Sequence, residues 1–468
     1  MKNILFIILS IFLLIEVNGN FMRKLKTEEI PQGPTSGEDA PEPPSGDNPP
    51  GPPPSGDDKN NYDYSNYKAT SMNENLESKE LTSTTEDQSV VYINDTDITI
   101  VNSNLIKKSG DSSNIENSEF YGVNAAVLVQ GGQVKIEGGS IMTQAKGANS
   151  LCVTNNGKAT ISGTTIISTA ESSARGLHAT YGGEITASNV VIASTGGSCA
   201  NLATDRGEGI VTCSECSLST SGAGSPLIYS TGQITVSKTI GKSTKAQMVV
   251  VEGKNTATVE EDSKLECYGI GNRNNVDNCG IFLYQSMSGD AEDGISTYKC
   301  KDSSMTISSE SSVYSSAPMF FITNTKANIN LENCTLSYGS NIFLNSAGTS
   351  EWGNSGSNGG EVTVTLTNQE VKGDITVDGI STLELKLINS KLTGTINKDK
   401  TASALAINLD ASSSITLTGD SYYTSLTNSD NSGSNIEKNS YKFEQYGNES
   451  SNGSWIKMSL LLISFILF

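Results

Sequence analysis

The chain has 468 residues, with 31 basic and 51 acidic side chains, 45 glycines, 8 cysteines and a single histidine, His178. A net charge of −20 argues against a nucleic-acid-binding protein, because affinity for phosphate backbones comes mainly from clustered Lys and Arg. One histidine excludes a histidine-rich metal site and leaves His178 as the only histidine that could act as a catalytic base.

Residues 1–19 have the form of a secretory signal peptide. Lys2 supplies a positive charge, and residues 4–15 are apolar apart from Ser10. This run is too short to cross a bilayer as a helix, which needs about 20 residues. Cleavage is therefore predicted after Gly19.

Residues 20–87 are predicted to be a disordered spacer. Ten of the twelve prolines fall between Pro31 and Pro54, among Gly, Ser, Glu and Asp, and the sequence stays polar to about residue 88. Such a segment cannot bury enough apolar surface to fold, so it is expected to be extended and solvated.

A repeat begins after the spacer. Apolar triplets are centred on residues 128, 152, 178, 202, 228 and 250, at steps of 24, 26, 24, 26 and 22, and each triplet precedes a turn. Two further β-like runs follow each turn, as in residues 133–136 and 165–168. Three short strands per period are typical of one coil of a parallel β-helix.

Residues 88–428 are therefore predicted to form an all-β, right-handed parallel β-helix of about 13 coils. Its coils should stack strand on strand at a spacing of about 4.8 Å. An array of β-sandwiches is the alternative, but it does not predict the near-constant period or the aligned glycines.

Several turns of the repeat resemble known sequences. The turns at residues 180–183, 204–209, 230–232 and 252–255 are similar to those of secreted microbial β-helix proteins of the pectin-lyase-like superfold, an adhesin-like group. The resemblance covers about residues 120–428 and implies the fold and a carbohydrate-binding role. No catalytic set carries over, because neither the Asp cluster of pectate lyases nor the Asp and His cluster of polygalacturonases occurs as a contiguous motif.

The residues that follow the first strand of each coil are predicted to line a ligand-binding strip. They are Thr180, Tyr181, Asp205, Arg206, Tyr229, Ser230, Glu252, Lys254 and Asn255. Sugars need this mixture of flat apolar rings and fixed polar groups. The alternative is a polar ladder that only satisfies the backbone groups of the turns.

Asp205, Arg206 and Glu252 are the candidates for catalysis. Asp205 and Glu252 lie two coils apart, hence about 10 Å, which is close to the carboxyl separation of inverting glycosidases. Arg206 and Lys254 supply positive charge for an acidic sugar.

Three insertions interrupt the repeat, at residues 267–279, 286–300 and 346–360. In solenoids, such loops map to one face, which is often the binding face. Asp290, Glu292 and Asp293 make the second insertion a candidate Ca²⁺ loop, and Ca²⁺ is the one cofactor considered. A solvated acidic loop explains the same residues.

Eight cysteines in a secreted chain predict disulfides, and they allow 105 pairings. Cys267 with Cys279 is the preferred pair, because it would close the first insertion. Four N-glycosylation sequons are present, and Asn94 and Asn333 are the two within the repeat.

The C-terminus is predicted to be processed. Residues 429–451 form a polar linker, and residues 452–468 end in a short apolar tail that starts at Met458. Small residues, a polar spacer and such a tail are typical of a GPI-attachment signal, with attachment near residues 448–451. An apolar tail that docks on the fold is the alternative.

These features predict a GPI-anchored cell-surface protein that acts as an adhesive or structural module and presents a glycan-binding face. Its predicted partners are a polysaccharide or cell-surface glycan and, through the lipid anchor, the membrane. The alternatives are a polysaccharide lyase or glycoside hydrolase acting on an acidic plant-type polysaccharide, which the fold permits but does not show, and a purely architectural coat protein.

Overall fold

The computed structural model describes residues 60–168 and 172–447. The predicted signal peptide, the Pro-rich part of the spacer and the predicted GPI signal lie outside these residues. Within them, no helix is long and apolar enough to cross a membrane.

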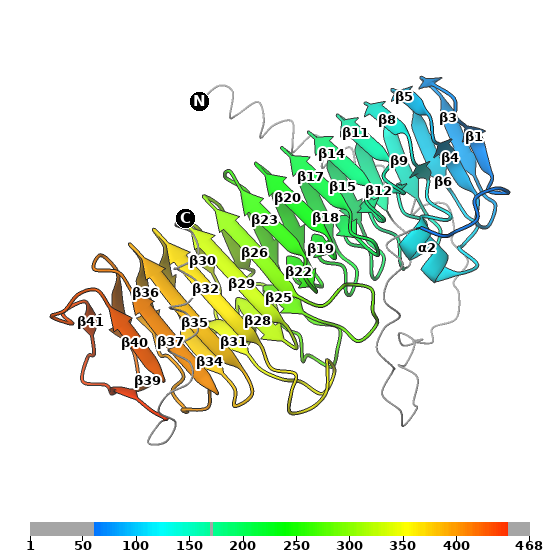
Figure 1. Ribbon diagram of the computed structural model, residues 1–468. Coiled ribbons are helices and arrows are strands. Elements are labelled where there is room, and N and C mark those ends of the chain that lie inside the picture. Colours follow the sequence, from blue (N-terminus) through cyan, green and yellow to red (C-terminus); the bar gives the residue numbers. More distant parts are fainter. Residues whose placement is uncertain (1–59, 169–171, 448–468) are drawn as a thin grey trace, which may run out of the picture. The chain divides into compact units, whose positions relative to one another are not determined.

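The described residues form a parallel β-helix (Figure 1). Successive coils place their strands in three long sheets, and neighbouring strands of each sheet run parallel and in register, as β11 (Lys158–Ser162) and β14 (Glu184–Ser188) do over five residues. This confirms the predicted fold. The second sheet holds 14 strands, close to the predicted coil number.

The three long sheets are called A, B and C. Sheet A contains β1 (Ala69–Met72), β4 (Ser89–Asn94), β7 (Val127–Gln130), β10 (Leu151–Thr154), β13 (Leu177–Ala179), β16 (Leu202–Thr204), β19 (Ile228–Ser230), β22 (Val249–Glu252), β25 (Ile281–Tyr284), β28 (Phe320–Thr323), β31 (Ile342–Ser346) and β34 (Asp374–Val377). Sheet B contains β2 (Leu76–Glu77), β5 (Asp97–Val101), β8 (Gln133–Glu137), β11, β14, β17 (Ile210–Ser214), β20 (Gln233–Ser237), β23 (Thr256–Glu260), β26 (Ile295–Lys301), β29 (Lys326–Glu332), β32 (Glu361–Thr367), β35 (Thr382–Ile388), β37 (Ala404–Leu409) and β40 (Ser425–Asn428).

Sheet C contains β3 (Glu80–Ser83), β6 (Asn104–Lys107), β9 (Ser140–Thr143), β12 (Thr165–Ser168), β15 (Val191–Ser194), β18 (Ser217–Thr220), β21 (Ile240–Ser243), β24 (Lys264–Cys267), β27 (Ser304–Ile307) and β30 (Thr335–Ser337). Two smaller sheets complete the C-terminal coils: β33 (Glu370–Lys372), β36 (Lys391–Gly394), β38 (Ser414–Leu417) and β41 (Ile436–Glu437), and then β39 (Ser421–Tyr423) with β42 (Phe443–Gln445).

Alternation along each strand builds a single core inside the coils. In β14, Ile185 and Ala187 point inward and are 1% exposed, whereas Thr186 between them faces solvent. One continuous apolar cluster runs from Leu76 to Phe443. Since one coil cannot bury these residues alone, stacking on its neighbours is what stabilises it.

The solenoid is longer than predicted at both ends. Its first coil starts at Ala69 instead of residue 88, and its last strand ends at Gln445 instead of residue 428. The predicted spacer and the predicted C-terminal linker are therefore wrong for residues 69–87 and 429–445. The first coil was not predicted because its strands are short and polar: β2 has two residues, and β3 is Glu-Leu-Thr-Ser.

The cysteines do not pair as preferred. The sulfur atoms of Cys213 and Cys216, and those of Cys300 and Cys334, lie at disulfide-bonding distance. Cys267 and Cys279 are separate buried thiols, so the predicted bond between them is wrong in this structure. The reason is that Cys267 belongs to the core inside the coils, whereas Cys279 packs in an apolar cluster outside sheet A.

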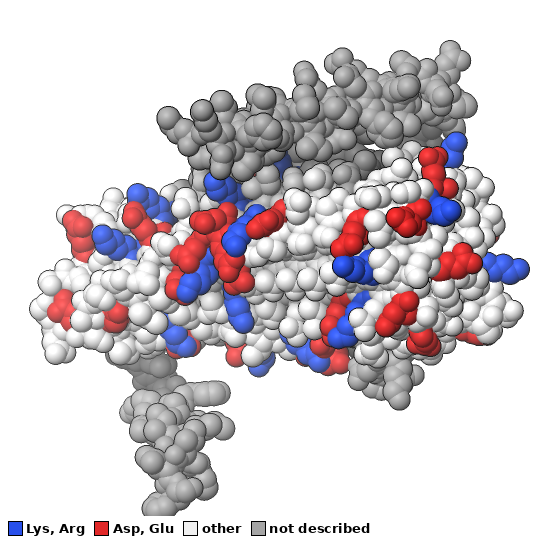
Figure 2. All heavy atoms as spheres, turned by 90° about the horizontal axis from the view of Figure 1, so that it is seen from above, with Lys and Arg blue, Asp and Glu red and all other residues white. Residues whose placement is uncertain are grey.

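The surface carries charge of both signs. On the face in Figure 2, Lys and Arg side chains lie in small groups beside Asp and Glu. Ion pairs between neighbouring coils, such as Lys158 with Glu184 at 2.8 Å, are part of this pattern. Asn94 and Asn333 are both exposed, as glycosylation requires, and their modification stays a prediction.

Candidate functional site

The outer face of sheet A is where inserted segments gather. Each strand turns a central residue outward, and this row includes Leu128, Cys152, His178, Ala203, Tyr229, Val250, Phe282 and Phe321. The row is covered by residues 60–67, by α2 (Ile115–Tyr121), by loop 286–294 and by loop 347–359. Figure 1 shows α2 and the long loops on one side of the solenoid.

Helix α2 lies in an insertion between β6 and β7. Asn114 caps its start by accepting a hydrogen bond from Glu116 N, and Gly122 ends it in the left-handed conformation at φ 73°. This conformation suits glycine, which has no Cβ to clash. The helix presents Glu119, Phe120 and Tyr121 to the sheet and the neighbouring turns.

Four tyrosines form a cluster at the C-terminal end of α2, which we call the tyrosine platform: Tyr62, Tyr64, Tyr121 and Tyr181. The ring centroid of Tyr62 lies 4.8 Å from that of Tyr64 and 5.4 Å from that of Tyr121, and the Tyr121 ring stacks on Tyr181 at 5.7 Å and 4°. The hydroxyl of Tyr64 donates to the Tyr121 carbonyl at 2.7 Å, and that of Tyr121 to Asn61 Oδ1 at 3.1 Å. Tyr62, Tyr64 and Tyr121 are partly buried, whereas Tyr181 is buried.

The turn after β16 continues this surface. Gly207 has φ 72°, and a Cβ there would lie 2.4 Å from Cδ1 of Tyr181, so only glycine allows the ring to pack. Arg206 extends over the Phe120 ring at 3.8 Å and donates from Nε and Nη2 to Asp290 Oδ1 at 3.0 and 2.9 Å. Arg206 therefore joins α2 to loop 286–294.

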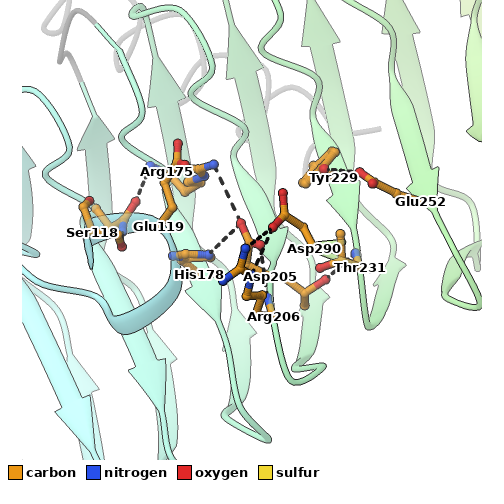
Figure 3. A network of polar contacts seen from close by, with 12 residues as sticks. Ser118, Glu119, Arg175, His178, Asp205, Arg206, Tyr229, Thr231, Glu252 and Asp290 are labelled. Carbon is orange, nitrogen blue, oxygen red and sulfur yellow. Dashed lines mark hydrogen bonds and ion pairs between the residues drawn. The ribbon is translucent and has the colours of Figure 1, made fainter. Parts of the chain in front are cut away.

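A buried ionic network lies next to Arg206 (Figure 3). Arg175 contacts Glu119 of α2 at 2.9 Å and Asp205 at 3.8 Å, and His178 Nε2 lies 4.0 Å from Asp205. The side chains of Arg175 and Asp205 are 10% and 6% exposed, and that of His178 is fully buried.

Burial dominates the titration of this network. It raises the pKa of Asp205 well above its usual range, and Asp290 and Glu119 add to the rise while Arg175 opposes it. It lowers the pKa of His178, and the charge of Arg175 acts in the same direction, which keeps the imidazole neutral.

Glu252 is a second buried carboxyl, two coils further along. Its Oε2 accepts hydrogen bonds from the hydroxyls of Tyr229 at 2.5 Å and Tyr284 at 2.7 Å. Burial raises its pKa, against the effect of hydrogen bonds from Ser286 and the two tyrosines. With Asp205, this gives two carboxyl groups on one face with raised pKa values.

The raised pKa of Glu252 predicts a pH-dependent stability. A carboxyl whose folded pKa exceeds its unfolded value stabilises the fold fully below that unfolded value, here 4.5, and loses the contribution as pH rises through the folded pKa. Relative to wild type, Glu252→Gln should therefore gain stability as pH rises above about 4.5, by up to about 1.4 kcal/mol per pH unit until the folded pKa of Glu252 is passed.

Thermal unfolding of both proteins across this range measures the effect. Comparison with wild type at each pH removes the contributions of other groups such as Asp205. A difference in Tm that stays constant with pH would show that Glu252 has an ordinary pKa.

Ion pairs hold two acidic side chains of loop 286–294. Lys254 Nζ lies 2.6 Å from Glu292 and 2.8 Å from Glu208, and Asp290 is taken by Arg206. Asp293 is exposed. In residues 60–168 and 172–447, no three or more His, Cys, Asp or Glu side chains are arranged to hold a metal ion, and Ca²⁺ binding by Asp290, Glu292 and Asp293 stays a prediction.

The predicted strip is mostly covered. Thr180 is fully buried and donates to Thr154 Oγ1 at 2.9 Å, and Asn255 donates to the Glu252 carbonyl at 2.6 Å. Ser230 points inward, where its hydroxyl donates to the carbonyls of Gly232 and Thr256, so its predicted place on the outer face is wrong. Arg206 and Lys254, each 38% exposed, are the parts of the strip that reach solvent most.

Part of the site was not predicted from the sequence. Glu119 and Tyr121 belong to α2, Tyr62 lies before β1, and Arg175 lies in the turn before β13. The spacing of the repeat contained one signal. Tyr92 and Leu128 occupy equivalent positions in neighbouring coils but are 36 residues apart, which is longer than the period of the repeat. The extra residues are the insertion that contains α2.

No protein-family model, curated protein or solved structure matches the chain. Its function must therefore be inferred from the geometry of these residues.

Proposed function

We propose that the protein is a GPI-anchored adhesive rod on the cell surface, and that the tyrosine platform is its glycan-binding face. The observation that carries the proposal is the pair of partly buried rings, Tyr62 and Tyr121, which reach solvent in part and are held in a fixed arrangement by their neighbours. Rigid aromatic faces next to polar groups suit sugar rings, which stack through their C–H faces and orient through their hydroxyls. The likeness of the turns to adhesin-like proteins of the pectin-lyase-like superfold supports the same role by analogy.

Burial favours binding over hydrolysis or elimination. Asp205 and Glu252, the candidate catalytic carboxyls, are 5% and 1% exposed, and the ion pairs of Arg206 and Lys254 hold loop 286–294 against this face. A polysaccharide therefore meets the tyrosine platform first, and a lyase or hydrolase would require the loop to leave.

A glycan-binding measurement with the purified full-length chain tests the proposal. The panel contains neutral, uronic-acid and amine-bearing oligosaccharides. Tyr62→Ala should weaken binding of the recognised glycan about tenfold, because a lost ring contact of this kind is worth about 0.5–1.5 kcal/mol beyond its buried area. Tyr62→Phe keeps the ring and should bind as wild type does.

Tyr441 provides a matched control, since it is 41% exposed and lies near the other end of the solenoid. Tyr441→Ala should bind normally. If no glycan of the panel binds, or if Tyr62→Ala binds as tightly as wild type, the platform is not a glycan site and the architectural alternative is favoured.

A further inference from the structure

Loop 286–294 crosses the outer face of sheet A back toward the N-terminal coils. It begins after β25, and Asp290 in its middle reaches Arg206 in the turn after β16, three strands away in the order of the sheet. Glu292 contacts Lys254, in the turn after β22, at 2.6 Å. Two carboxylates therefore fasten the loop to coils other than its own.

The loop backbone is fitted closely to the turn after β22. Lys254 N donates to the Glu292 carbonyl at 2.9 Å. Gly253 has φ 67°, and a Cβ there would lie 2.4 Å from the Glu292 carbonyl oxygen and 2.8 Å from the Cβ of Ala291. Only glycine lets the loop lie this close, so the closed position is built into the chain.

Little apolar burial holds the closed loop. Ala291 is its one buried apolar side chain, whereas Met287 is 44% exposed. The ion pairs with Arg206 and Lys254 are partly exposed, and pairs of this kind contribute little to stability. A ligand that replaces these contacts can therefore lift the loop and leave the coils beneath it folded.

Between its attachment points, the loop spans a row of buried polar side chains on four successive coils: Asp205, Thr231, Glu252 and Tyr284. Figure 3 shows the first three. Thr231 is 1% exposed, and its Oγ1 has no hydrogen-bond partner within the described residues. Most buried polar groups have a partner, because leaving one unpaired costs free energy. A hydroxyl-rich ligand that enters when the loop lifts would supply this partner.

Asp290 occupies the cation that a carboxylate ligand would use. Arg206 donates from Nε and Nη2 to Asp290 Oδ1 at 3.0 and 2.9 Å, and its guanidinium lies over the Phe120 ring at 3.8 Å. This ring contact supports the guanidinium when Asp290 leaves, and a planar guanidinium is well suited to a carboxylate. Exchange of Asp290 for a ligand carboxylate keeps the charge balance around Arg206 unchanged.

We propose that loop 286–294 is an autoinhibitory strap, which a uronic-acid glycan displaces by taking the place of Asp290 on Arg206. This inference rests on the proposed function and names the class of its ligand. The row continues the tyrosine platform, because Gly207, next to Arg206, packs on the Tyr181 ring. A glycan bound to the platform therefore reaches Arg206, and the hydroxyl-binding side chains of the row favour a sugar over an acidic peptide.

The test compares an oligoglucuronate with the cello-oligomer of equal length and linkage, and with an oligoglutamate of equal charge. The full-length protein is titrated in EDTA, so that Ca²⁺ does not compete for the loop carboxylates. Asp290→Asn frees Arg206 and should tighten oligoglucuronate binding about three- to tenfold, because the built-in competitor is removed. Arg206→Gln should remove the preference for oligoglucuronate over the cello-oligomer. Saturating oligoglucuronate should speed up hydrogen exchange in residues 286–294 of the wild type.

Asp293 provides the matched control. It lies in the same loop, is exposed and makes no ion pair within the described chain, so Asp293→Asn should bind oligoglucuronate within about twofold of wild type. The strap is overturned if Asp290→Asn binds no more tightly than Asp293→Asn, or if exchange in the loop stays unchanged. Either result leaves the proposed function standing where glycan binding still depends on Tyr62. Equal binding of oligoglutamate overturns the glycan as ligand of Arg206, and failure of both oligosaccharides to bind wild type and Asp290→Asn overturns inference and function together.

Discussion

Replacing Arg175 with methionine is expected to destabilise the N-terminal coils by about 3–5 kcal/mol, because it leaves buried carboxylates without their counter-charge. The Arg175 side chain is 10% exposed and contacts Glu119 at 2.9 Å and Asp205 at 3.8 Å. Asp205 would become protonated more readily, and α2 would lose its ionic contact with the turn before β13. Urea unfolding followed by circular dichroism measures the loss.

A double-mutant cycle separates the energy of the Arg175–Glu119 ion pair from the energy of packing the Arg175 side chain. Glu119→Gln removes the charge that Arg175→Met leaves unpaired, so the double variant should be less destabilised than the sum of the two single variants. Lys158→Met is the control, since its ion pair with Glu184 is half-exposed and worth at most about 1 kcal/mol. If Arg175→Met and Lys158→Met cost the same, the network contributes no more than a surface ion pair.

The coil architecture could be predicted because stacking imposes it on the sequence. Every coil must place inward residues above those of the previous coil, so apolar positions recur at a near-constant period. Ile161, Ala187, Cys213, Val236 and Val259 form one such row in sheet B. The first coil lacked this signal because β2 contributes a single apolar residue, Leu76.

Which face of sheet A each side chain lies on was harder to predict. In sheet A, Ala203 pairs with His178 and Tyr229 pairs with Ala203, whereas the apolar triplets place Leu202 and Ile228 in that row. A shift of one residue turns every side chain of a strand to the other face. The triplets could not reveal it, because sheet A carries apolar residues on both faces, inside the coils and beneath the inserted segments.

The site itself depends on contacts with no period. Arg206 meets Asp290 over 84 residues of chain, and Arg175 meets Glu119 over 56. These contacts arise because insertions from different coils fold onto the same outer face. The sequence shows where the insertions occur, and it does not show which of their side chains meet.

Replacing Phe320 with alanine is the second substitution with a large expected effect, a loss of about 3–5 kcal/mol. Phe320 is fully buried inside the coils, with its ring centroid 5.7 Å from that of Tyr298 and 5.5 Å from that of Phe343. Removal of the ring leaves a cavity that the stacked coils cannot close without shifting their strand register. Ile295→Ala is the control: Ile295 is 47% exposed, and this change should stay within about 0.5 kcal/mol.

The location of the damage tests the solenoid more sharply than its size. Because each coil contacts only its neighbours, the cavity at Phe320 should weaken β25, β28 and β31 and leave distant coils unaffected. Hydrogen exchange should therefore speed up in peptides that cover residues 281–284, 320–323 and 342–346, with β7 and β10 unchanged. Uniform loss of protection along the chain would mean that the coils unfold as one cooperative unit. A ligand bound to the tyrosine platform would then stabilise the C-terminal coils as much as the N-terminal coils that it contacts.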